Sequence, residues 1–130
     1  KKMEKYKINN LRFKKELFNK LKLNNVFNYY GLIEQTGSIY IECPTCNSFV
    51  ASIFSDVFIR DKNFELVENG NSGMVQLISL LPTSYPGHNI LTDDLGEIIK
   101  SKNKNCKLIG KHFLIHGRIK NSETRGCSDV

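Results

Sequence analysis

Residues 56–79, DVFIRDKNFELVENGNSGMVQLIS, carry the pattern that decides the fold. The first five are rich in β-branched and aromatic side chains, which predicts a strand over residues 56–60. Residues 61–63 (DKN) form a turn, and residues 69–73 (NGNSG) are a strong turn signal. An apolar run over residues 74–79 predicts the next strand. Short strands separated by turns predict a β-rich domain.

The chain before this stretch begins with a predicted amphipathic helix. Apolar side chains recur at helical spacing over residues 11–23, on a stripe formed by Leu11, Leu17, Phe18 and Leu21. Lysines occupy the opposite side, so we expect a solvated face that carries Lys14, Lys15, Lys20 and Lys22.

Further short strands surround the central stretch. Apolar and aromatic runs predict strands over residues 26–30, 38–42, 97–100 and 111–116. The last two could form a hairpin, with residues 102–106 near its tip, and residues 117–130 look like a polar loop. Residues 47–55 fit either a helix or a strand. The predicted class is therefore α+β, and a continuous helix over residues 46–58 would instead favour a thioredoxin-like fold.

Composition bounds the function as well. The 130 residues suffice for one domain, and no apolar run approaches the ~20 residues that cross a bilayer. The net charge of +6 is uneven: residues 1–22 carry +7, residues 23–97 carry −7 and residues 98–130 carry +6. A nucleic-acid binder needs its positive charge on one continuous face, so this distribution argues against that class.

Three short motifs carry candidate chemistry. In residues 30–34 (YGLIE), Tyr30 beside Gly31 offers a flat ring next to exposed backbone, and Glu34 could hold Mg²⁺. In residues 92–96 (TDDLG), expected at a strand end, a carboxylate could accept hydrogen bonds from ribose hydroxyls. In residues 117–120 (GRIK), an arginine presents a fixed fork of donors. Taken singly, the first two motifs are better explained by a core tyrosine and a plain turn, and the third is unremarkable.

In this order and spacing the three motifs resemble the adenylate-forming (AMP-binding) ligase superfamily. The resemblance implies that Tyr30 contacts adenine and that Glu34 binds Mg²⁺ with ATP. It also implies that Asp94 and Arg118 bind the ribose, while Lys120 occupies the hinge position. Ile33 and Asp93 depart from the superfamily pattern.

Within that superfamily the chain is most similar to acyl-protein synthetases. The similar stretches are residues 30–39, 84–88 and 123–127 (ETRGC). The resemblance implies a cytoplasmic ligase that activates a fatty acid with ATP, transfers the acyl group to Cys127 and works with an acyl-reductase partner. We expect the chain to be the C-terminal part of such an enzyme. Its predicted segments are a basic helix over residues 1–25, a nucleotide-facing β-rich part over residues 26–116, and a hinge with the C-terminal segment over residues 117–130.

Four cysteines are too few for a disulfide scaffold, which favours free or metal-bound thiols. Cys43 and Cys46 have the spacing of a zinc knuckle, and Cys106 is the natural third ligand. His112 or His88 could be the fourth. The alternatives are two inert buried thiols or a redox pair at a helix N-terminus.

Two other functions compete with the ligase. The first is a zinc-stabilised interaction module built as a small β domain. The second, more distant, is a thiol–disulfide oxidoreductase. Nucleotide binding separates the ligase from both, whereas zinc is compatible with the ligase and with the interaction module.

Overall fold

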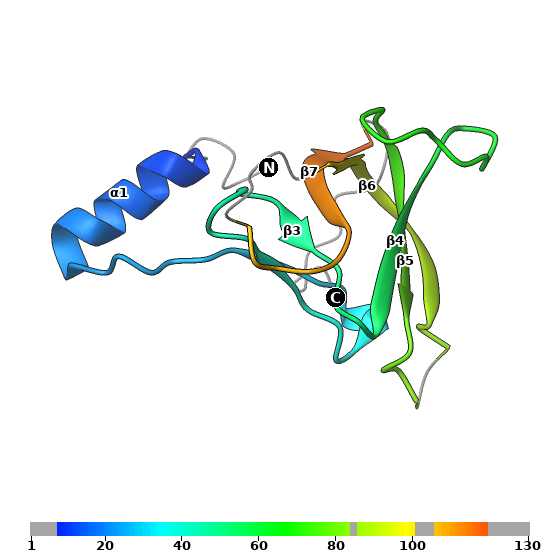
Figure 1. Ribbon diagram of the computed structural model, residues 1–130, viewed down its shortest axis with the longest axis horizontal. Helices are drawn as coiled ribbons and strands as arrows, with labels where there is room; N and C mark the ends of the chain where they lie inside the picture. Colours follow the sequence, from blue (N-terminus) through cyan, green and yellow to red (C-terminus); the bar gives the residue numbers. More distant parts are fainter. Residues whose placement is uncertain (1–7, 84–85, 101–105, 120–130) are drawn as a thin grey trace, which may run out of the picture.

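The computed structural model describes residues 8–83, 86–100 and 106–119. It contains one helix, one 3₁₀ turn and seven strands, so the predicted α+β class with a dominant sheet is confirmed. The sheet is antiparallel throughout, with the strand order β1-β2-β3-β7-β6-β5-β4. Figure 1 shows the long strands at one end of the molecule and the helix at the other.

The elements in chain order are α1 (Asn10–Leu21), β1 (Tyr29–Tyr30), η2 (Ile33–Gln35), β2 (Tyr40–Glu42), β3 (Phe49–Val50), β4 (Ser55–Arg60), β5 (Gly73–Ser79), β6 (Asn89–Ile99) and β7 (His112–Arg118). The two strands predicted from the central stretch are confirmed as β4 and β5, which pair with each other. The predicted hairpin is confirmed as the pairing of β6 with β7. Its predicted tip lies mostly outside the described residues.

Three sequence predictions about these elements are wrong in detail. Residues 92–96 do not end a strand, because β6 continues through them to Ile99. Gly117 and Arg118 belong to β7 and not to a loop, since Asp94 and Leu95 pair with them. Of the strand predicted over residues 26–30, only Tyr29 and Tyr30 find a partner strand.

The core lies inside the curl of the sheet. Its buried residues come from both halves of the strand order, and they are Tyr40, Ala51, Val57, Ile59, Val75, Leu77, Ile98 and Phe113. Ser38, just before β2, donates or accepts a 2.6 Å hydrogen bond with Ser79 at the end of β5, so the two halves meet across the core. Phe113 also packs edge-on against Tyr40, with ring centroids 5.4 Å apart.

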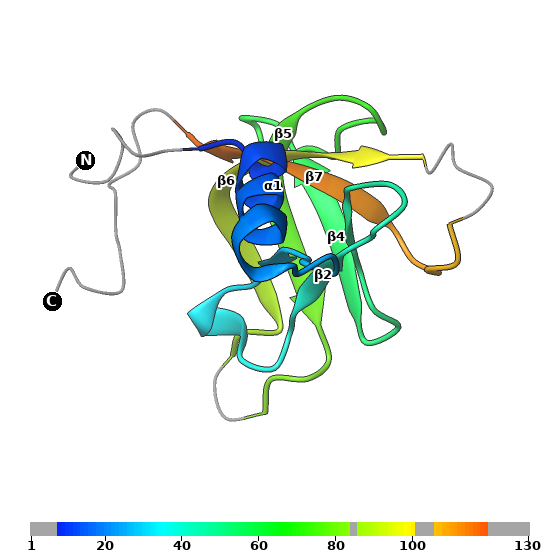
Figure 2. The same cartoon turned by 90° about the vertical axis from the view of Figure 1, so that its left-hand side faces the viewer.

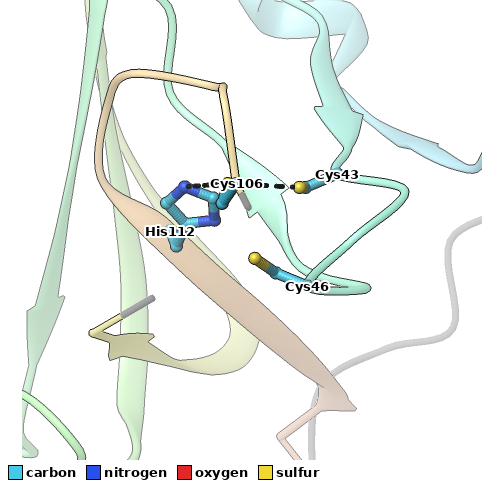
Figure 3. A group of neighbouring side chains, drawn as sticks. All are labelled: Cys43, Cys46, Cys106 and His112. Carbon is cyan, nitrogen blue, oxygen red and sulfur yellow. Dashed lines mark hydrogen bonds between the residues drawn. The ribbon is translucent and has the colours of Figure 1, made fainter. Parts of the chain in front are cut away.

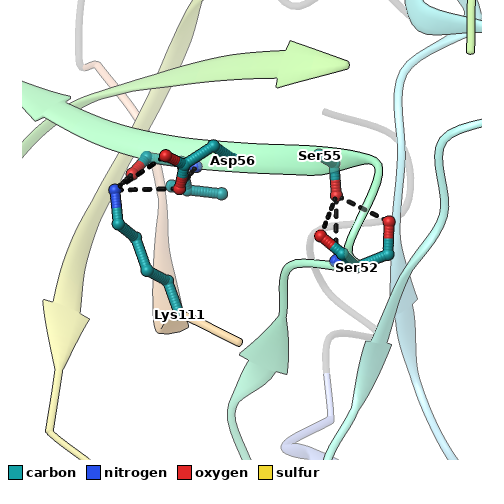
Figure 4. Close-up of polar contacts among 5 residues, drawn as sticks. Ser52, Ser55, Asp56 and Lys111 are labelled. Atoms are coloured by element: carbon teal, nitrogen blue, oxygen red, sulfur yellow. Dashed lines mark hydrogen bonds and ion pairs between the residues drawn. The ribbon is translucent and has the colours of Figure 1, made fainter. Parts of the chain in front are cut away.

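Lys111, just before β7, contacts β4 at the edge of the sheet. Its ammonium lies 2.8 Å from a carboxylate oxygen of Asp56 and donates to the carbonyl of Val57 at 3.1 Å (Figure 4). It also lies 4.0 Å from the centre of the Phe58 ring, a cation–π distance. In the same view, the hydroxyls of Ser52 and Ser55 bind each other and close the turn that precedes β4.

Helix α1 corrects one further expectation. It projects from the sheet and none of its residues is buried, so the predicted apolar stripe is largely exposed, with Leu11 79% accessible (Figures 1 and 2). Lys14 does not lie on a free solvated face, because it forms a 2.6 Å ion pair with Glu42. Burial opposes the charge of Glu42, but the backbone N–H of Asn28 and the Lys14 ammonium lower its pKa below the ordinary value.

Gly96 allows β6 and β7 to approach each other. A Cβ atom at this position would lie 2.4 Å from the carbonyl oxygen of Leu114 and 2.7 Å from a methyl group of Val75. The register of the two strands shifts between Leu95 and Gly96, as a β-bulge does.

We therefore expect Gly96→Ala to lower the free energy of unfolding by about 1–3 kcal/mol, the usual cost of forcing atoms into a packed interior. Urea denaturation of the purified protein measures this change. An unchanged midpoint would contradict the close pairing of β6 and β7 at this position.

Candidate functional site

A cleft opens beside β6. Its volume of about 430 Å³ is large enough for a small-molecule ligand. Its walls come from the segment around η2, from β6 and from the end of β7. The lining residues are Leu32, Glu34, Ile90, Leu91, Thr92, Asp93, Asp94 and Arg118. Three residues proposed from the sequence motifs, namely Glu34, Asp94 and Arg118, thus line one cavity.

Asp94 is the best-connected carboxylate in this cleft. The hydroxyl of Tyr30 donates a 2.7 Å hydrogen bond to its Oδ2. The Nε atom of Arg118 lies 3.6 Å from its Oδ1, and the Asp94 side chain is only 15% exposed. These contacts connect three segments that lie far apart in the sequence and fix the carboxylate toward the cleft.

The backbone of β6 adds to this order. Thr92 is buried and its hydroxyl donates to the carbonyl of Val75 at 2.9 Å. The same oxygen accepts the backbone N–H of Asp94 at 3.1 Å. On the other side, the N–H of Ile119 binds the carbonyl of Asp93 at 2.9 Å. The two adjacent aspartates are therefore held within a strand rather than in the turn that their sequence suggests.

Tyr30 stands between the cleft and the core. Its ring packs against Tyr40, Phe49 and Phe113, with ring centroids 5.9–6.2 Å apart. Burial, and then the adjacent Asp94 carboxylate, raise the pKa of its hydroxyl, so the group stays protonated and continues to donate. Tyr30 thus orients Asp94 in addition to packing in the core.

Gln35 is a site-supporting residue that sequence reasoning missed. It is fully buried and accepts a 3.0 Å hydrogen bond from the Tyr40 hydroxyl, while its amide donates to the carbonyl of Gly87 at 3.0 Å. Gly87 in turn packs so closely on Glu34 that a Cβ atom would lie 2.0 Å from the Glu34 carbonyl oxygen. These contacts fix the backbone of Glu34, which is the residue before Gln35. Nothing in the sequence around Gln35 indicated that this polar side chain would be buried, because its burial depends on the arrangement of the sheet.

Gly31 exposes backbone next to Tyr30, and its own Cβ would lie 3.1 Å from the Ser38 carbonyl oxygen. Lys120 and Cys127 lie outside the described residues, so their predicted roles stay predictions. No helix in the part of the chain that the structure covers is both long and apolar enough to span a bilayer.

A second group of side chains lies at the other end of β7. Cys43, Cys46 and Cys106 come together there with His112, and all four candidate ligand atoms lie within 4.8 Å of one another (Figure 3). The structure thus brings the three predicted cysteines together and supplies His112 as their neighbour. It does not bring His88 into the group.

The thiol of Cys43 is prepared for ionisation. Its burial opposes the thiolate, but hydrogen bonds from the backbone N–H groups of Thr45 and Cys46, and from neighbouring thiols, lower its pKa below the ordinary value. The described residues that follow Cys46 form β3 and β4 and no helix, so the redox interpretation lacks the helix N-terminus on which it depended.

One comparison with known proteins identifies a family. A family model described as "Acyl-protein synthetase, LuxE" matches residues 1–130. No curated protein and no solved structure matches the chain.

Proposed function

The chain belongs to the LuxE acyl-protein synthetase family, and from this premise we propose that it forms the nucleotide-binding cleft of an ATP-dependent acyl-protein ligase. The observation that carries the proposal is the meeting of Glu34, Asp94 and Arg118 around one cleft, with the Tyr30 hydroxyl bound to Asp94. The pairing of β6 with β7 brings Asp94 beside Arg118, and the segment around η2 brings Glu34 to the same cleft.

The charges of the cleft suit the two ends of a nucleotide. Asp94 can accept hydrogen bonds from both hydroxyls of a ribose, as acidic residues do in other nucleotide-binding folds. Arg118 can donate to ribose or phosphate oxygens beside it. Tyr30 has two roles in this proposal. Its hydroxyl orients Asp94 through a hydrogen bond, and it contacts adenine as the family resemblance implies.

The carboxylates also fit Mg²⁺, which prefers hard oxygen ligands and is usually held by one or two carboxylates together with substrate phosphates. Glu34 and Asp93 line the cleft with Asp94, and Glu34 is exposed to it. Glu34 would be the main protein ligand of this ion, which would neutralise charge on the phosphates.

The proposed reaction has two steps. In the first step, a fatty-acid carboxylate oxygen attacks the α-phosphorus of ATP. The bond between the α-phosphorus and the oxygen that bridges to the β-phosphate breaks, so pyrophosphate departs and an acyl-adenylate forms. The thiolate of Cys127 then attacks the acyl carbonyl carbon, the bond to AMP breaks, and a thioester remains on the protein. The acyl group would pass from this thioester to an acyl-reductase partner.

We expect Glu34→Gln to lower the rate of adenylation by about tenfold while nucleotide affinity changes little, because Mg²⁺ loses a charged ligand and the ribose contacts remain. ATP–pyrophosphate exchange measures the rate, and equilibrium binding of AMP measures the affinity. Glu65→Gln, on the exposed turn after β4, is the matched control and should leave both unchanged. Equal exchange rates in the two variants would remove Glu34 from the metal site.

A further inference from the structure

The structure points to a metal centre apart from the nucleotide cleft. We propose that one Zn²⁺ ion is bound by a tetrahedral group of four side chains, Cys43, Cys46, Cys106 and His112. The argument rests on the shape of a turn, on the distances between ligand atoms and on the orientation of the histidine.

The turn between β2 and β3 is shaped to present two thiols together. The N–H of Cys43 binds the carbonyl of Ser48 at 2.7 Å, and the N–H of Asn47 binds the carbonyl of Cys43 at 2.9 Å. Asn47 adopts φ = 51°, a left-handed conformation that asparagine tolerates better than most residues. The narrow loop therefore turns Cys43 and Cys46 toward the same space, as in a zinc knuckle (Figure 3).

The observed distances match those of a tetrahedral zinc ion. With Zn–S bonds of about 2.3 Å and a Zn–N bond of about 2.05 Å, tetrahedral geometry requires S···S and S···N separations of about 3.8 and about 3.6 Å. The Cys43 and Cys106 sulfurs lie 3.5 Å apart, and the Cys106 sulfur lies 3.6 Å from Nε2 of His112. These two separations are close to the tetrahedral values, and all four ligand atoms lie within 4.8 Å of one another.

His112 is oriented for this role by Ser48. The Ser48 hydroxyl lies 2.8 Å from Nδ1 of His112, and both residues are buried, at 0% and 5% exposure. Nε2 is thereby left on the side that faces the thiols. A metal-binding histidine almost always has its second nitrogen fixed by a hydrogen bond, which sets the tautomer and the ring direction.

Inert or disulfide-bonded cysteines would not explain this arrangement. Two buried thiols that only fill space need no third thiol and no oriented imidazole beside them. A disulfide between Cys43 and Cys106 would use two sulfurs and would not explain why Cys46 and His112 lie beside them. Zn²⁺ uses all four ligands and closes a structural site.

The ion would reinforce a short junction of the sheet. β3 and β7 are joined by only two residue pairs, Phe49 with Phe113 and Val50 with His112. This junction separates β1, which carries Tyr30, from β6 and β7, which carry Asp94 and Arg118. Ligands from the turn before β3 and from β7 bridge the same junction, so Zn²⁺ would hold the two halves of the cleft in register.

Metal analysis of the purified full-length protein tests the proposal. We expect one zinc ion per chain by mass spectrometric metal analysis, and near zero in Cys46→Ser and Cys106→Ser, because a serine hydroxyl is a poor zinc ligand. His88→Asn is the matched control and should retain one ion. Chelation should lower the unfolding temperature of the wild-type protein and leave that of the serine variants unchanged.

A measurement on the wild-type protein keeps the test valid even if the serine variants do not fold. Replacement of zinc by Co²⁺ should give the charge-transfer absorption of cobalt–thiolate bonds. Protein without this absorption, full zinc content in Cys106→Ser, or a Cys43–Cys106 disulfide in protein prepared under reducing conditions would each overturn the assignment. None of these measurements requires turnover, so their failure is distinguishable from failure of the ligase proposal.

Discussion

Replacement of Cys127 by serine is expected to abolish the acylated form of the protein and to leave formation of the acyl-adenylate unchanged. Only the second step of the proposed reaction uses a thiol, and a serine hydroxyl is not ionised at neutral pH. Arg118, Lys120 and Arg125 are close to Cys127 in the sequence, and we expect their charges to favour its thiolate. The loss of acyl transfer should therefore be complete.

The two steps are measured separately. ATP–pyrophosphate exchange reports adenylation, and incorporation of a radiolabelled fatty acid into the protein reports acylation. Ser128→Ala, at the adjacent position, is the control and should keep both activities. If the Cys127→Ser protein still carries the acyl label, the acceptor is a different residue and the assignment of Cys127 is wrong.

Asp94→Ala should weaken ATP binding by about 1.5–3 kcal/mol, which corresponds to about a 10- to 150-fold rise in Kd. This is the range for a hydrogen bond that involves a charged group. The variant also leaves the Tyr30 hydroxyl without its acceptor and Arg118 without its carboxylate partner, so the cleft loses its order as well as a ligand contact.

Glu65→Ala is the control, because it removes an exposed carboxylate outside the cleft and changes the charge by the same amount. Isothermal titration with ATP measures both variants. Normal affinity in Asp94→Ala, or an equal loss in both variants, would show that Asp94 does not bind the ribose.

Local patterns in the sequence predicted the strands that are bounded by strong turns. β4 and β5 follow from an apolar run on each side of turn residues, and the pairing of β6 with β7 follows from their short separation. The same reasoning placed residues 92–96 at a strand end, because Asp-Asp-x-Gly resembles a turn. The bulge at Gly96 and the buried Thr92 let β6 run through this sequence, and both depend on strands that are distant in the chain.

Non-local packing also explains the other differences. The apolar stripe of α1 has the correct spacing for a buried face, but spacing does not specify a partner. Among the described residues, none buries Leu11 or Leu21, and both side chains are exposed. The choice between His112 and His88 could not be made from spacing alone, since it depends on the pairing of β3 with β7. The convergence of Tyr30, Asp94 and Arg118 was predicted only through the family resemblance, because 64 positions separate the first two.

The position of a bound nucleotide tests the central claim most directly. A crystal structure of the intact protein with AMP and Mg²⁺ should place the two ribose hydroxyls within about 2.7–3.2 Å of donor or acceptor atoms of Asp94 and Arg118, in the cleft beside β6. AMP bound at any other part of the protein, with this cleft vacant, would contradict the account.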